Sequence, residues 1–173
     1  MLVLDFETRS RVDLKKSGTY LYVSDPSTDI LCMAIHDIPT KHVQLWYPGE
    51  PLPERIRYAL EHADFIAAHN AEFDQGIYEC IGVPDYDFPE IPAERWYCTS
   101  AQCRENALPA SLDDAAWALG LKNRKYAQGA DLIKLLSIPN ADGLFNEDPV
   151  KLKEMGEYCM QDVNVTVDIV NHT

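Results

Sequence analysis

The chain has 173 residues and a mass of 19.6 kDa, which is the size of one ordinary domain. Its 46% hydrophobic and 25% charged residues are typical of a globular protein and exclude a collagen, a coiled coil and a disordered chain. The 28 Asp and Glu residues outnumber the 15 Lys and Arg residues, and the formal net charge of -13 argues against coating long nucleic acid by charge alone. This charge is compatible with a small site that holds cations and binds only the end of a nucleic-acid strand.

The first part of the chain carries the strand-like segments. The continuous apolar run Met1-Leu2-Val3-Leu4 predicts a strand over residues 1–6 that is covered on both faces. Further strands are predicted over residues 30–36, 42–46 and 65–68.

The rest of the chain is predicted to be mainly helical. A helix over residues 71–81 is expected to end at Gly82, and one over residues 111–119 is expected to end at Gly120 after an N-cap at Ser111. The other predicted helices cover residues 53–62, 99–105 and 130–136 and a long last segment that begins at Asp148 and Pro149.

Early strands, late helices and strand–helix alternation between them favour an α/β or mixed α+β domain around a central sheet. The sequence has no internal repeat, low-complexity tract or long linker, so residues 1–173 are expected to form a single domain. No apolar run reaches the roughly 18 residues of a membrane span, and no signal peptide is visible. We therefore expect no membrane contact and a cytoplasmic location.

The cysteines are odd in number and include no Cys-x-x-Cys pair. This pattern predicts reduced, buried thiols rather than a disulfide framework or a zinc knuckle. The five cysteines are Cys32, Cys80, Cys98, Cys103 and Cys159.

Asp5 and Glu7 follow the first apolar run. On a strand, residues two apart share a face, so both carboxylates are expected on one side of the sheet and Phe6 on the other. Neighbouring carboxylates repel, and one stays protonated unless a cation binds both. A solvent-exposed turn after the strand is the alternative interpretation, because Asp and Glu are common at protein surfaces.

A second acidic feature begins the helix that follows the fourth strand. Phe73, Ile77 and Ile81 form an apolar stripe on this helix, and Asp74 lies in its first turn. The ordinary interpretations are an N-cap for Asn70 and a carboxylate favoured by the helix dipole for Asp74.

Asp162 interrupts the apolar stripe of the last helix. A carboxylate in such a seam is costly to ionise without a partner. Tyr158 lies one turn earlier, so its phenol can approach the same site. An Asp at the edge of the seam that pairs with a nearby Lys or caps another element is the alternative. The stripe consists of Leu152, Met155, Cys159, Thr166 and Ile169.

Together these features supply carboxylates at strand and helix ends, with a tyrosine beside one of them. Oxygen-rich clusters of this kind suit Mg²⁺ or Mn²⁺. Two such ions can clamp the attacking and leaving oxygens of a phosphodiester displacement. No cysteine or histidine cluster in the sequence competes for a softer metal.

Three short motifs, taken in chain order, resemble those of the DnaQ-like 3′–5′ exonucleases of the DEDDy branch. The segment Asp5-Phe6-Glu7-Thr8 resembles D-x-E-T. Residues 70–74 resemble N-x-x-[FY]-D, and residues 158–162 resemble Y-x-x-x-D. The resemblance covers nearly the whole chain and implies a ribonuclease H-like fold, a five-stranded mixed sheet flanked by helices.

Between the motifs, the chain is similar to the proofreading domain of bacteriophage-type family A DNA polymerases. The residues that carry this similarity are Cys98-Thr99, Leu108-Pro109 and 112–121. Such polymerases carry a polymerase domain after the exonuclease. The resemblance therefore implies either an autonomous exonuclease that acts beside a separate DNA polymerase or an excised domain.

The resemblance also implies roles for the acidic residues. Asp5 would bridge two metal ions, Glu7 and Asp162 would complete the first metal site, and Asp74 would hold the second ion through water. Tyr158 would orient the attacking water. The cofactors implied are two Mg²⁺ or Mn²⁺ ions.

The same resemblance implies substrate contacts. Thr8 would lie near the terminal 3′ hydroxyl, and Asn70 and Phe73 would contact the terminal nucleotides. The implied activity is release of nucleoside 5′-monophosphates from single-stranded or frayed DNA 3′ ends. The alternatives are an RNA-trimming enzyme of the same superfamily and a catalytically silent module that docks a replication protein.

Overall fold

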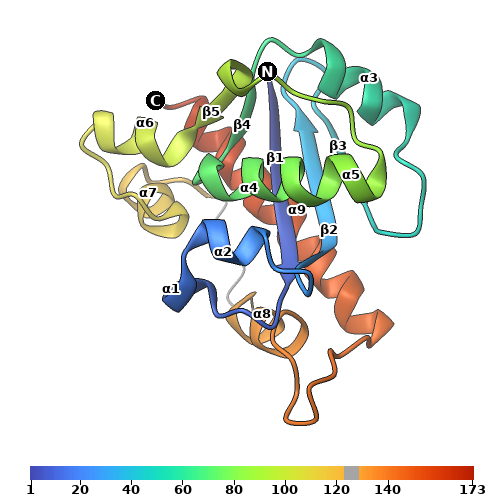
Figure 1. The fold of residues 1–173 in the computed structure, drawn as a ribbon. Helices are drawn as coiled ribbons and strands as arrows, with labels where there is room; N and C mark the ends of the chain where they lie inside the picture. Colours follow the sequence, from blue (N-terminus) through green and yellow to red (C-terminus); the bar gives the residue numbers. More distant parts are fainter. Residues whose placement is uncertain (123–128) are drawn as a thin grey trace.

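A five-stranded sheet forms the centre of the molecule, with strand order β3-β2-β1-β4-β5 (Figure 1). The computed structural model describes residues 1–122 and 129–173. The open, mixed sheet flanked by helices confirms the α/β class and is consistent with a ribonuclease H-like fold. The strands are β1 (Leu2–Arg9), β2 (Asp29–Asp37), β3 (His42–Trp46), β4 (Ile66–Ala68) and β5 (Trp96–Cys98).

The two edges of β1 are paired over different lengths. β2 pairs antiparallel with all of β1, and a bulge shifts the register between Glu7 and Thr8. On the other side, the short parallel strand β4 pairs only with Leu2 and Val3. The later residues of β1 therefore have one edge beyond the end of β4, where other elements can reach the backbone.

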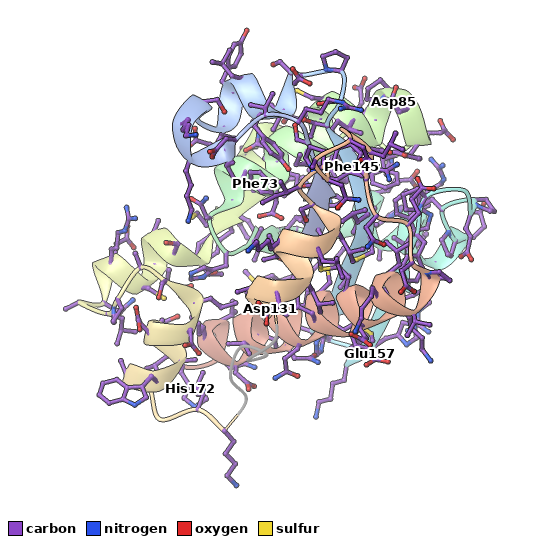
Figure 2. The ribbon with its side chains drawn as sticks, turned by 90° about the horizontal axis from the view of Figure 1, so that it is seen from below. Phe73, Asp85, Asp131, Phe145, Glu157 and His172 are labelled. Atoms are coloured by element: carbon purple, nitrogen blue, oxygen red, sulfur yellow. The ribbon has the colours of Figure 1, made fainter. Side chains whose placement is uncertain are left out.

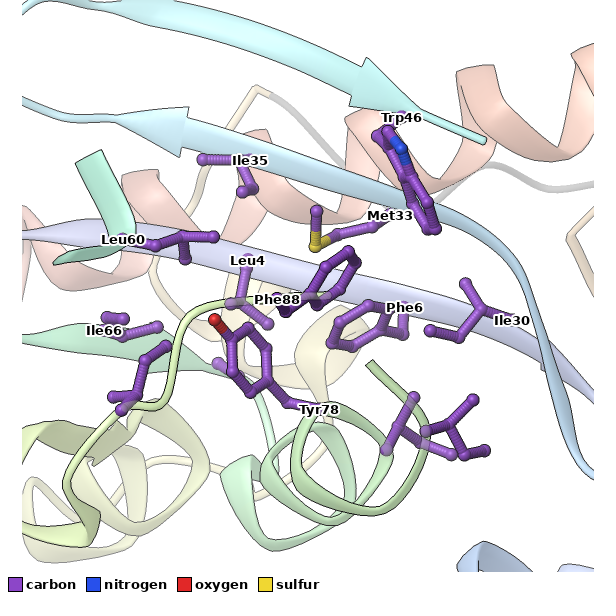
Figure 3. Packing of buried hydrophobic residues seen from close by; sticks show 14 of the residues in the cluster. Leu4, Phe6, Ile30, Met33, Ile35, Trp46, Leu60, Ile66, Tyr78 and Phe88 are labelled. Carbon is purple, nitrogen blue, oxygen red and sulfur yellow. The ribbon is translucent and has the colours of Figure 1, made fainter. Parts of the chain in front are cut away.

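One face of the sheet is covered by the helices that lie in front of β1 in Figure 1. Leu2, Leu4 and Phe6 point into this layer, where Phe6 packs on the rings of Tyr78 and Phe88 (Figure 3). The elements of this side of the chain are α1 (Leu14–Ser17), α2 (Thr19–Val23), α3 (Glu54–His62), α4 (Ala71–Ile77), the π-helical turn η1 (Tyr78–Gly82) and α5 (Val83–Tyr86).

The opposite face is covered by α8 (Gly129–Leu136) and the long helix α9 (Pro149–Val170). Val3 of β1 packs in this layer against residues of α9. Asp148 caps α9 by accepting the backbone N–H of Val150 at 2.8 Å. The end of α9 also packs against α6 (Thr99–Glu105) and α7 (Leu112–Ala118).

Several elements differ from the sequence prediction. Gly82 does not end a helix, because the chain continues helically to Tyr86; its missing side chain instead leaves room for the ring of Phe88, whose Cε2 would lie 2.9 Å from a Cβ. β1 extends past its apolar run to Arg9, because its polar end still pairs with β2. The elements α1, α2, α5 and β5 and the 3₁₀ turn η2 (Ala93–Arg95) are too short for a periodic pattern.

All five cysteines are free thiols. Burial was correctly predicted for Cys32, Cys103 and Cys159, whereas Cys80 is exposed and Cys98 is half-buried. In the described parts of the chain, no helix is both long and apolar enough to cross a membrane.

Candidate active site

Asp5 and Glu7 lie side by side on the face of β1 that α9 covers. Asp5 pairs with Ala34 of β2 and is half-buried, while Glu7 pairs with Cys32 and is only 9% exposed. The alternative of a solvent-exposed turn is wrong, because β1 continues past both residues. Two carboxylates are thus fixed in a partly dry layer, where their repulsion is weakly screened.

Cys159 of α9 joins this pair. The ligand atoms of Asp5, Glu7 and Cys159 all lie within 4.8 Å of one another. The Cys159 thiol donates to the backbone oxygen of Asp5 at 3.3 Å, and its Sγ lies 3.5 Å from Asp5 Oδ2. Burial, Cys32 and the two carboxylates raise the pKa of Cys159 well above its usual range, so the thiol stays protonated.

Cys159 occupies an unspecified position of the third motif, so the motifs did not single it out. Its signal was present, since it belongs to the buried stripe of α9 and lies next to Tyr158 and three residues before Asp162. The carboxylate oxygens of Asp5 and Glu7 outnumber this single thiol among the possible ligand atoms. The donor set therefore favours a hard divalent ion over a thiophilic one.

Asp74 reaches β1 from α4. Its side chain is 2% exposed, and its Oδ1 accepts the backbone N–H of Phe6 at 3.1 Å, on the edge of β1 that β4 leaves open. Burial and the negative charge of Asp5 raise the pKa of Asp74 well above its usual range, although the hydrogen bond from Phe6 lowers it. A cation beside these carboxylates would remove that penalty.

Tyr158 and Asp162 approach the same cluster from α9. Tyr158 is 1% exposed and Asp162 is 5% exposed, so the interruption of the apolar stripe is a buried carboxylate. Burial raises the pKa of the Tyr158 phenol most, and the charges of Asp162, Glu7 and Asp5 raise it further. The phenol is therefore neutral and faces the carboxylates of both β1 and α9.

A close approach by α8 fixes the Tyr158 ring. Gly129 begins α8, and a Cβ at this position would lie 2.8 Å from Cζ of the ring. A glycine is needed here because any side chain would displace the phenol. No local pattern predicts this contact, because it joins residues that are 29 positions apart.

The residues with implied substrate contacts lie around the end of β1. Thr8 is 6% exposed, and its Oγ1 lies 2.9 Å from the hydroxyl of Tyr22. Phe73 is half-buried with its ring centroid 5.7 Å from that of Tyr22. Asn70 is exposed at the start of α4 with a left-handed backbone (φ 70°), unlike the extended backbone of an ordinary N-cap.

Tyr22 connects this region to the acidic cluster. Burial raises the pKa of its phenol, the hydrogen bond with Thr8 lowers it, and the charge of Glu7 raises it. The Tyr22 hydroxyl therefore lies within electrostatic range of the Glu7 carboxylate. The sequence motifs did not include this residue.

Two arginines lie just past the cluster, where β1 ends. The guanidinium carbons of Arg9 and Arg11 are 5.2 and 5.6 Å from the ring centroid of Phe145. Arg9 also forms ion pairs with Asp29 and Glu147, each at 3.3 Å. These contacts hold the loop before α9 against the end of β1. Phe145 of this loop is labelled in Figure 2.

Comparison with known proteins adds one relationship. No protein-family model matches the sequence. The chain is 36% identical over 182 residues of alignment to a DNA polymerase of Bacillus phage SP02. The alignment covers 98% of this chain and 27% of that polymerase, so the chain spans about a quarter of the length of this curated relative.

Proposed function

We propose that this chain is a metal-dependent 3′–5′ exonuclease that degrades or proofreads DNA 3′ ends and releases nucleoside 5′-monophosphates. One observation carries the proposal. Carboxylates from β1, α4 and α9 meet near one end of the central strand, and the backbone of Phe6 binds Asp74 between Asp5 and Glu7. Similarity to part of a phage DNA polymerase supports DNA as the substrate.

The carboxylates fit divalent cations. Asp5 would contact two Mg²⁺ or Mn²⁺ ions, Glu7 and Asp162 would complete the first site, and Asp74 would hold the second ion through water. When bound, such ions lower the pKa of water and offset the charge of a phosphodiester. The raised pKa of Asp74 supports this fit, because burial and the charge of Asp5 disfavour its ionised form, and a bound cation would offset that penalty.

The side chains around the carboxylates have separate tasks. Tyr158 is a neutral phenol held by its packing against Gly129, so its hydroxyl can orient the attacking water while remaining protonated. Thr8 would bind near the terminal 3′ hydroxyl, and Phe73 would pack against the base or sugar. Asn70, exposed at the start of α4, would contact the terminal nucleotides.

The negative net charge suits an enzyme that binds only the ends of DNA strands. A formal charge of -13 disfavours wrapping of long duplex DNA. Single-stranded or frayed ends need only a few nucleotides in contact, and stacking on aromatic side chains can supply their affinity. Residues 1–173 would form one exonuclease domain that acts beside a DNA polymerase, whether in a separate chain or in the same one.

The test uses labelled single-stranded DNA and RNA of the same sequence, with Mg²⁺, with Mn²⁺ and with a chelator. We expect DNA degradation that depends on the ion, and no degradation by Asp162→Asn. Glu157→Gln is the matched control, because Glu157 is an exposed carboxylate on the same helix. Full activity in the chelator would contradict the metal-dependent mechanism, and degradation of RNA alone would assign the RNA-trimming alternative.

A further inference from the structure

A short pair of helices packs beside the acidic cluster. α2 follows α1 directly and lies against α4, the helix that carries Phe73 and Asp74. Tyr22 and Val23 of α2 are buried in the core layer of that face. This packing places Tyr22, which belongs to none of the motifs, between β1 and α4.

The hydroxyl of Tyr22 holds the hydroxyl of Thr8. The two oxygens lie 2.9 Å apart in a buried hydrogen bond, and each residue is 6% exposed. A hydroxyl in such a bond keeps one rotamer and one orientation of its remaining lone pair or proton. The bond therefore sets the direction in which Thr8 can meet a ligand.

The ring of Tyr22 also supports Phe73. Their centroids are 5.7 Å apart, and the rings are tilted by 48°. Aromatic pairs in tilted arrangements attract each other beyond the burial of their surface. One side chain thus contacts both a hydroxyl from β1 and a ring from α4.

The backbone of Tyr22 is itself anchored. The Thr28 hydroxyl donates to the Tyr22 carbonyl at 2.6 Å, and the oxygens of Thr28 and Ser10 lie 2.7 Å apart. The Thr28 hydroxyl is thus shared between the Tyr22 carbonyl and Ser10 Oγ, and Ser10 Oγ in turn accepts the backbone N–H of Val12 at 3.0 Å. This chain of bonds ties α2 to the segment after β1 and limits movement of Tyr22 relative to Thr8.

We propose that Tyr22 is a positioning residue for the 3′-terminal nucleotide, an inference that rests on the proposed exonuclease function. Tyr22 holds the Thr8 hydroxyl and the Phe73 ring in a fixed relation, with the hydroxyl at the sugar and the ring beside the base or sugar. It does not contact the reacting atoms. Its loss should therefore weaken substrate binding in the ground state and the transition state alike.

The test is Tyr22→Phe, which keeps the ring beside Phe73 and removes only the hydroxyl. With single-stranded DNA and Mg²⁺, KM should rise about 5-fold, the value of one ordinary hydrogen bond, while kcat changes by less than about twofold. In a Thr8→Val background, the same change should raise KM no further, because its partner is already absent.

Tyr78→Phe is the matched control. The Tyr78 hydroxyl is another tyrosine donor in the same core layer, and it binds the carbonyl of Pro89 at 2.6 Å. This variant should lower Tm but leave KM unchanged. An unchanged KM in Tyr22→Phe, or an equal rise in the Thr8→Val background, would overturn the inference while the wild type remains an active nuclease. A wild type that degrades neither DNA nor RNA would contradict the proposed function and the inference with it.

Discussion

Replacing Glu7 with glutamine should make the metal-free protein more stable. The ligand atoms of Asp5 and Glu7 lie within 4.8 Å of each other on one strand. Two unit charges at this separation repel by roughly 3.5 kcal/mol at an effective dielectric constant of about 20. A proton bound by the cluster removes part of this repulsion, so we expect Glu7→Gln to raise the free energy of unfolding by about 1–3 kcal/mol near neutral pH.

Thermal unfolding in a chelator and in Mg²⁺ measures this effect. For a chain of this length, the gain corresponds to roughly 3–10 °C in Tm. Mg²⁺ should raise the Tm of the wild type, because it binds the folded state, and should raise that of Glu7→Gln less. Glu94→Gln alters an exposed carboxylate in η2 and should change neither value. A Glu7→Gln protein that is less stable than the wild type in the chelator would refute the repulsion argument.

Three further predictions concern the residues around the cluster. Tyr158→Phe should keep the wild-type Tm but lower the cleavage rate roughly 10- to 1,000-fold, the loss of one positioned hydrogen bond; a wild-type rate would assign the ring to packing alone. Gly129→Ala places a Cβ 2.8 Å from Cζ of Tyr158, so it should lower the free energy of unfolding by about 1–3 kcal/mol. It should also lower kcat by a larger factor than it changes KM, because the phenol is displaced. Equal changes in kcat and KM would argue against that displacement. Because folding raises the pKa of Asp74, the unfolded chain releases this proton first, and the stability of the metal-free protein should fall as pH rises above the ordinary value of 3.8. Asp74→Asn should flatten that slope in chemical denaturation with a chelator, and identical slopes would contradict the assignment.

The periodic elements of this fold could be predicted from sequence. The stripe of α9 located a buried carboxylate at Asp162, and the cap at Asp148 located the start of the helix. The apolar pattern does not predict the polar end of β1 as part of the strand. This end is strand because it pairs with β2, and its own residues are not an apolar run. β5 has three half-buried residues at the edge of the sheet, too few for an alternating pattern.

The site depends on contacts between distant segments that no local pattern records. The bond from Phe6 to Asp74 exists because β4 is short, and that length is not evident from its own residues. Tyr22 lies in a helix of five residues, which is too brief to show a buried face in sequence. Cys159 was assigned correctly to the core, but its position against Asp5 follows from the crossing of α9 over β1.

The direction of degradation tests the central proposal most directly. A single-stranded DNA labelled at its 5′ end should give a ladder of progressively shorter labelled products in Mg²⁺, with release of nucleoside 5′-monophosphates. The same strand with a blocked 3′ end should resist. Efficient cutting of a closed single-stranded circle, or immediate release of the 5′ label as a mononucleotide, would contradict attack from the 3′ end.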